Sequence, residues 1–325
     1  MSSASEGSAP RAVIAALLDA ALKQCGVLGL VIATEGSTYA KAGTILSLGS
    51  AARCGWISGG CLEPMLETEA LRIEEEGAGL LLELDTRDDM DLMFGTRMGC
   101  RGLLQMALLP MAMVEGIEPL LTTWRDGEQT LLLGGDHCSF SAAIGDQRRR
   151  WDVDWQRGEG VELVLSWSIR IAAPPRVLVL GAGPETHSLL RNLRDLGVRV
   201  DVVESRPRWI ETAAEADCHI QSTPDQALVD TALAAYSAVL VMNHDFERDR
   251  ESLDALTATT NPWIGLLGPP RRRDDLLALL TPEQRDSLTP RLHAPVGLPL
   301  GGHGPEAIAL SIAAQLQMLW NAVDG

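Results

Sequence analysis

The sequence predicts an α/β protein, in which an N-terminal α/β domain precedes a C-terminal Rossmann-like domain with a doubly wound parallel sheet. After residue 176, short apolar runs alternate with helical stretches, the pattern that builds a parallel sheet. Before residue 110, strand-like and helix-like apolar patterns are also mixed. We therefore place an N-terminal domain at 1–110, a β-rich insert and linker at 111–175, and the Rossmann-like domain at 176–325.

The N-terminal domain is expected to combine two helices with several strands. Its apolar periodicity predicts helices over 10–25 and 62–76, and strands over 27–33, 44–48, 55–58, 80–84 and 103–109. Residues 35–38 interrupt this pattern and are expected to form a loop after the first strand.

The segment 111–175 has a different pattern. Two glycines, an arginine cluster at 148–150 and several tryptophans interrupt its short apolar runs, which is typical of a small β-rich region. It ends at 172–175, where adjacent prolines can continue neither a helix nor a central strand.

The C-terminal domain has the clearest pattern. Apolar strands are predicted over 177–180, 198–203, 238–242 and 263–267, and helices up to 196, over 249–258 and over 305–320.

Composition excludes several classes of partner. The 325 residues carry 27 Lys and Arg against 44 Asp and Glu, a net charge of −17, which would be repelled by nucleic acid and by anionic membranes. No apolar run is long enough for a membrane span, and residues 1–10 lack the apolar centre of a signal peptide. We therefore expect a cytoplasmic protein. Its six scattered cysteines predict reduced thiols, neither a disulfide framework nor a structural zinc site.

Ser58-Gly59-Gly60-Cys61 is the strongest candidate for chemistry. Its glycines let backbone amides approach a ligand, and the helix predicted to follow would direct those amides at an anion. A helix start also favours a thiolate, so Cys61 is a candidate reactive sulfur, although most free cysteines only fill a core. Cys100, between Gly99 and Arg101, is a second thiol in a glycine-rich setting.

A dinucleotide-type turn opens the C-terminal domain. Gly181 and Gly183 follow a buried strand and precede a helix, and Glu204 ends the next strand, where it could bond a ribose. The third glycine of the fingerprint is missing. A Rossmann-like domain that has lost or changed its ligand is therefore the competing interpretation.

Three further polar loops are weaker candidates. Ser37 and Thr38 offer hydroxyls at a strand end, and Arg271 begins an arginine run that is either solvated or a phosphate clamp. Residues 301–304 form another glycine turn, with Pro305 at the first position of the last helix.

The order of these motifs resembles the XdhC/CoxI family, the xanthine dehydrogenase accessory proteins. The N-terminal resemblance rests on Gly36-Ser37-Thr38, on Ile57 to Glu63 and on Met98-Gly99-Cys100-Arg101-Gly102. The C-terminal one rests on Leu180 to Pro184, Met242-Asn243-His244-Asp245, Gly265 to Gly268 with Arg271 to Arg273, and Pro295 to Leu298. It spans nearly the whole chain except the middle segment. Tyr39-Ala40-Lys41 and Arg101 depart from the common family pattern.

The resemblance implies a maturation factor without turnover of its own. Such a factor binds molybdenum cofactor (molybdopterin), supports its sulfuration and delivers it to a molybdenum hydroxylase client such as xanthine dehydrogenase. A cysteine desulfurase and a second copy of the chain, as a homodimer, are further candidate partners. Cys61 and Cys100 match the family's cysteines and are the implied metal contacts. The implied cofactor-binding set is Ser37, Thr38, Ser58, Gly59, Gly60, Cys61, Cys100, Gly181, Gly183, Glu204 and Arg271.

Two other functions stay open at this point. An NAD(P)-dependent oxidoreductase would use the Gly181 turn and Glu204 for a nucleotide. A protein adaptor would link a desulfurase to its client without any bound cofactor.

Overall fold

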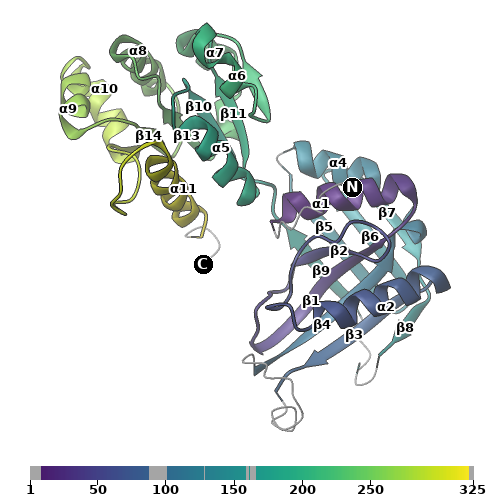
Figure 1. The fold of residues 1–325 in the computed structure, drawn as a ribbon. Helices are drawn as coiled ribbons and strands as arrows, with labels where there is room; N and C mark the ends of the chain where they lie inside the picture. The colour runs from purple at the N-terminus through teal and green to yellow at the C-terminus, as the bar shows by residue number, and fades with distance from the viewer. Residues whose placement is uncertain (1–8, 88–100, 128, 159–160, 162–165, 322–325) are drawn as a thin grey trace. The chain divides into compact units, whose positions relative to one another are not determined.

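The computed structural model describes residues 9–87, 101–127, 129–158, 161 and 166–321 (Figure 1). The chain divides into two compact units, Met1–Pro174 and Pro175–Gly325. This division falls within the expected linker, and the mixed α/β class is confirmed by the two units described below. The segment 111–174 belongs to the first unit.

The described residues of unit 1 form two sheets. The first has the order β2 (Ile45–Leu48), β1 (Val27–Ser37), β4 (Arg101–Pro110), β3 (Gly79–Asp85) and β8 (Trp155–Arg157), and is antiparallel except for the β3–β8 pair. The second is antiparallel, with the order β7 (Gln147–Asp152), β6 (Ser139–Ile144), β5 (Leu131–Asp136) and β9 (Ser166–Ile171). The α-helices among its described residues are α1 (Pro10–Lys23), α2 (Glu63–Glu76) and α4 (Glu118–Asp126).

The first sheet is buried on both faces. Met106 and Leu108 of β4 pack in one cluster with α2, whereas the alternate residues Ala107 and Leu109 pack in a second cluster with α1, α4 and the second sheet. Trp124 of α4 lies in that second cluster. The middle segment thus shares a hydrophobic core with the N-terminal residues, and β8 extends their sheet.

Two local expectations in unit 1 were wrong. Strand β1 continues to Ser37, because Gly36 and Ser37 pair with Gly102 and Arg101 of β4. Residues 55–58 form no strand, and within the described part of the chain the pairing nearest to them is an isolated bridge between Ser47 and Cys54. The chain turns instead before α2, and Gly60 has a left-handed φ of 102°.

Unit 2 is a parallel sheet with the order β12 (Cys218–Ile220), β11 (Arg199–Val203), β10 (Arg176–Leu180), β13 (Ala238–Val241), β14 (Ile264–Leu266) and β15 (Leu292–His293). Helices α5 (Thr186–Asp195), α6 (Ile210–Ala213) and α11 (Pro305–Asn321) pack on one face. On the other face lie α7 (Pro224–Asp230), α8 (Phe246–Thr257), α9 (Pro270–Ala278) and α10 (Pro282–Leu288).

This order identifies the ligand-binding edge of a Rossmann fold. In chain order the strands run 3-2-1-4-5-6, so the direction of winding reverses between β10 and β13. The carboxyl ends of these strands lead into the Gly181 turn and into the loop that contains His244. Ligands of doubly wound folds bind outside such a switch point. No helix within the described ranges combines the length and apolarity needed to span a bilayer.

Candidate functional site

The Cys61 turn is an exposed, open surface in unit 1. Cys61 is exposed and lies two residues before the first residue of α2. A Cβ added at Gly59 would meet no atom within 4 Å, and one at Gly60 would meet only a Trp56 ring carbon at 4.0 Å. The space beside the thiol is therefore open to a ligand.

A buried carboxylate stabilises this turn through hydrogen bonds on its core side. Glu63, which is 0% exposed, accepts the Ile57 amide at 3.0 Å, the Ser58 amide at 2.9 Å and the Ser58 hydroxyl. Burial by itself would raise the pKa of Glu63, but these hydrogen bonds favour the carboxylate and bring the pKa below its usual value. Glu63 therefore accepts as an anion and orients the Ser58 hydroxyl.

Three amides of the turn are satisfied internally. Those of Gly60, Cys61 and Leu62 each donate to Ser58 Oγ at 3.1 Å. The expectation that these amides face an external anion is corrected accordingly: Ser58 takes the position of the anion. The turn presents a thiol, and these three amides are not free backbone donors.

The structure joins two of the N-terminal motifs. Ser37 lies opposite Arg101 at the paired ends of β1 and β4, and the Thr38 hydroxyl donates to the Ala40 carbonyl at 2.7 Å. Cys100 lies outside the described residues, immediately before Arg101. Ala40 packs in the same buried cluster as Ile57, so the loop after β1 and the start of the Cys61 turn share one core.

In unit 2, the Gly181 turn also has its amides satisfied by the chain. The Gly181 amide donates to the Val203 carbonyl at 2.8 Å. The Ala182 amide donates to Glu204 Oε2 at 2.9 Å, and the Gly183 amide to Thr186 Oγ1 at 2.9 Å. Thr186 stands where the fingerprint has its third glycine. A phosphate at this turn would have to replace these acceptors.

Glu204 is buried in an ion pair. Its side chain is 0% exposed and pairs with Arg206 at 2.6 Å. Burial would raise the pKa of Glu204, but the Arg206 guanidinium and the backbone amides of Arg206 and Ala182 bring it below its usual value. Arg206 also donates to the carbonyls of Ala182 and Asn243. Glu204 thus bridges the turns after β10 and β11.

His244 covers the glycine turn from the β13 side. Its φ of 52° is in the left-handed region, which non-glycine residues seldom adopt. Its Nε2 lies 2.8 Å from the buried Glu185 carboxylate. That hydrogen bond raises the pKa of His244 above its usual value, although burial opposes the shift. A Cβ at Gly183 would collide with the ring, which shows how closely His244 lies against the turn.

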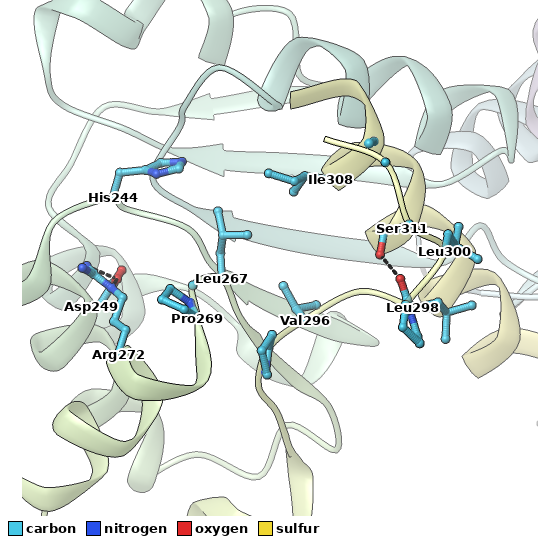
Figure 2. Close-up of a pocket in the computed structure, with 16 residues that line it drawn as sticks. His244, Asp249, Leu267, Pro269, Arg272, Val296, Leu298, Leu300, Ile308 and Ser311 are labelled. Atoms are coloured by element: carbon cyan, nitrogen blue, oxygen red, sulfur yellow. Dashed lines mark hydrogen bonds and ion pairs between the residues drawn. The ribbon is translucent and has the colours of Figure 1, made fainter. Parts of the chain in front are cut away.

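A pocket of about 610 Å³ lies on the β13–β15 side of the same edge (Figure 2). His244 and the Asp249–Arg272 ion pair border one side of it, and Ile308 of α11 borders another. Most of the remaining lining is apolar or glycine: Leu267, Gly268, Pro269, Pro295, Val296, Leu298, Pro299, Leu300, Gly301, Gly302 and Ala307.

The arginine of the 271–273 run that reaches this pocket is Arg272. It pairs with the buried Asp249 at 2.7 Å. Arg271, the residue expected to bind cofactor, has a side chain that is 91% exposed and lies 3.9 Å from Asp275. The difference follows from helical geometry, because neighbouring residues of α9 point in directions about 100° apart.

Sequence reasoning missed the charged groups at the switch point. Glu185 and Asp249 were not singled out, and Arg272 and His244 entered only as parts of motifs. The available signal was position: Glu185 lies in the turn after β10 and His244 in the loop after β13, at the carboxyl ends where ligands bind.

Comparisons with known proteins agree with this architecture. Residues 177–316 match the XdhC Rossmann domain and residues 19–85 match the XdhC and CoxI family. A Bacillus subtilis (strain 168) protein, named as a probable subunit of xanthine dehydrogenase, is 27% identical over 320 residues, which cover 92% of this chain and 95% of that protein. The uncharacterized protein YqeB of Escherichia coli (strain K12) is 28% identical over 156 residues, 46% of this chain and 28% of YqeB.

A solved structure has the same fold. The crystal structure of a Bacillus halodurans protein described as a xanthine dehydrogenase superposes with a TM-score of 0.75, at 24% identity, over 94% of this chain and 96% of that one. The two family models match separate parts of this chain, one in each unit. The chain belongs to the XdhC and CoxI family.

Proposed function

We propose that this protein is an accessory factor of a xanthine dehydrogenase system, which binds molybdenum cofactor, supports its sulfuration and delivers it to the client enzyme. Family membership and the similarity to a protein named as part of a xanthine dehydrogenase support the accessory role. The observation that carries cofactor binding is the exposed Cys61 thiol beside open glycines, on a turn braced by Ser58 and Glu63.

The Cys61 turn fits a cofactor with a soft metal end. A thiolate is a soft ligand, and the space over Gly59 and Gly60 leaves room for a large group to approach. The turn fits a phosphate poorly, because the amides of Gly60, Cys61 and Leu62 already donate to Ser58. For the anionic part of the cofactor we assign the joined ends of β1 and β4, where Ser37 lies opposite Arg101. The neighbouring Thr38 hydroxyl already donates to the Ala40 carbonyl, so an anion there would have to replace that acceptor.

When bound, molybdenum cofactor supplies the metal centre that takes up a terminal sulfido ligand. The protein's own contribution is to hold the turn in place and to keep the Cys61 thiol exposed. Glu63 fixes the Ser58 hydroxyl, Ser58 fixes the three amides, and Cys61 stays exposed at the end of this chain of contacts. A rigid turn keeps the thiol from collapsing into the core, where a free cysteine usually lies.

The proposal includes partners. We assign a molybdenum hydroxylase as client, a cysteine desulfurase as the source of sulfur, a homodimeric state and a cytoplasmic location. A thiol that is exposed on the surface can be reached by a second protein, which sulfur transfer and cofactor delivery both require.

Metal and pterin content test the proposal directly. The full chain is purified from a molybdate-supplied host, molybdenum is measured by mass spectrometry, and pterin by fluorescence after oxidative release. We expect both to copurify, and to fall about tenfold or more in Cys61→Ser if the thiol contributes about 1.4 kcal/mol or more to binding. The matched control is Cys218→Ser, another exposed cysteine, in unit 2, which should retain both.

Two results would contradict the proposal. Equal molybdenum and pterin in Cys61→Ser and wild type would remove the thiol from the site. Cofactor-free protein that still binds a molybdenum hydroxylase tightly would instead support the adaptor function.

A further inference from the structure

The pocket between the ends of β13, β14 and β15 has no assigned ligand. We propose that it binds a phosphorylated heterocycle of mononucleotide size, held in this half of the Rossmann edge alone. The proposal concerns unit 2 and does not depend on the Cys61 turn of unit 1. It predicts a ligand site different from the dinucleotide site that the Gly181 turn suggested.

The first argument is that the other half of the edge is closed. The amides of Gly181, Ala182 and Gly183 all have protein acceptors, and the Glu204–Arg206 pair fills the end of β11. A dinucleotide needs the glycine turn for its pyrophosphate and the acidic residue for its ribose. Here the Ala182 amide donates to Glu204, and the other two amides of the turn donate to Val203 and Thr186.

The second argument is the size and lining of the pocket. Its volume of about 610 Å³ lies within the usual range for small-molecule sites, roughly 300–1,000 Å³. Leu267, Val296, Leu298 and Ile308 supply apolar walls without a large aromatic side chain. Such walls suit the flat faces of a ring system, and the few polar groups at the ends would set its orientation.

The third argument is that the polar side chains at one end offer hydrogen-bond donors. Arg272 uses Nε and Nη2 on Asp249, and His244 uses Nε2 on Glu185. Arg272 Nη1 and His244 Nδ1 have no hydrogen-bond partner among the described residues. Arg272 Nη1 is a donor, and His244 Nδ1 is a donor in the protonated ring, since Nε2 faces Glu185. Asp249 offsets the charge of Arg272, and Glu185 that of a protonated His244, so this end favours an acceptor-rich group through its donors more than through net charge.

The fourth argument comes from the glycine loop that precedes α11. Gly301 and Gly302 line the pocket with left-handed φ values of 81° and 85°, and a Cβ at Gly301 would meet nothing within 4 Å. Within the described chain, the amides of residues 301–304, 306 and 307 have no acceptor, and they lie at the start of a 17-residue helix. Free amides at a helix start favour phosphate, although the Glu306 carboxylate lies in the same turn.

Together these features describe a ring system bound between apolar walls, with its phosphate at the donors of α11 and its polar ring edge at His244 and Arg272. Two kinds of molecule share this chemistry: purine mononucleotides and molybdopterin. The experiment has to distinguish them.

Calorimetric titration of the full chain tests the proposal. The probes are AMP, GMP, molybdopterin released from a purified molybdoenzyme, the unphosphorylated nucleosides, and NADH. We expect at least one monophosphate to bind, with about tenfold or greater loss of affinity when its phosphate is removed. A preference for AMP or GMP identifies a nucleotide site, and a preference for molybdopterin identifies a second contact for the cofactor.

Pocket variants locate the binding. Ile308→Trp should fill the pocket and lower affinity about tenfold or more. Leu310→Trp, on the same helix but outside the pocket lining, is the matched control and should bind like wild type. Ala307→Asp, checked for folding by circular dichroism, should weaken phosphate-bearing probes by placing a carboxylate at the free amides.

The proposal is overturned if none of the three monophosphates binds, or if Ile308→Trp and Leu310→Trp bind equally well. Tighter binding of NADH than of every monophosphate would also overturn it, since that result would restore the dinucleotide site.

Discussion

The Cys61 turn and the Gly181 turn have similar local sequences, but the outer surface of the first is open and that of the second is covered. Each is a glycine-containing turn that leads into a helix, and in each a buried glutamate accepts backbone amides. At the first turn, Glu63 acts through Ser58 from beneath, and the outer surface with its thiol remains open. At the second, Glu204 and Arg206 occupy the turn, and His244 covers it.

This difference shows that a glycine turn does not by itself define a ligand site. The position of the buried carboxylate decides whether the outer surface is left free. Three perturbations test the comparison, and we describe them from the largest expected effect to the smallest.

The largest effect is expected from Glu204→Ala. Removing this carboxylate leaves Arg206 without its buried partner, which typically costs about 3–5 kcal/mol of unfolding free energy. The measurement is the urea midpoint of the unit 2 transition, followed by tryptophan fluorescence. The exposed Glu215→Ala, which removes a glutamate paired with His187, is the control and should change the midpoint little. A small shift in Glu204→Ala would mean that Glu204 does not hold the turn.

A moderate effect is expected from Glu63→Gln. The amide that replaces the carboxylate has one acceptor oxygen for three donors, so about 2 kcal/mol of unit 1 stability should be lost. The turn should also loosen, which is measured as a changed alkylation rate of Cys61. Glu67→Gln, on the exposed part of α2, provides the control. An unchanged alkylation rate together with lowered stability would show that Glu63 stabilises unit 1 but does not control the exposure of the Cys61 thiol.

The smallest effect is expected from pH. The Glu185 hydrogen bond raises the pKa of His244, so its contribution to stability is complete below the unfolded imidazole pKa of about 6.5 and is lost as pH rises through the higher folded value. Asp249 also favours the imidazolium, whereas Arg206 opposes it. The thermal midpoint of unit 2 should decrease as the pH rises from about 6.5 through the folded pKa of His244.

Glu185→Gln identifies the source of this slope. Without the carboxylate, the fall in the thermal midpoint with rising pH should be reduced. Equal slopes in wild type and Glu185→Gln would show that His244 is not the titrating group.

The fold was more predictable from the sequence than the site was. Buried parallel strands are continuous apolar runs, so 177–180 and 238–242 could be located to within a residue of β10 and β13. Residues 55–58 have an apolar pattern too short to distinguish a strand from a turn, and no partner strand pairs with them. Residues 35–37 are polar, yet they extend β1 because β4 lies beside them.

The sequence by itself determined the α/β class, the division near the paired prolines and the cysteine that stands before a helix. These properties depend on local periodicity, proline geometry and neighbouring glycines, which act over a few residues. Only the tertiary structure decided that Ser58 and Glu204 occupy their turns, and that Arg272 rather than Arg271 reaches the pocket. The physical reason is that hydrogen-bond acceptors and ion pairs are chosen in three dimensions: His244 and Glu185 lie 59 residues apart in the chain and 2.8 Å apart in space.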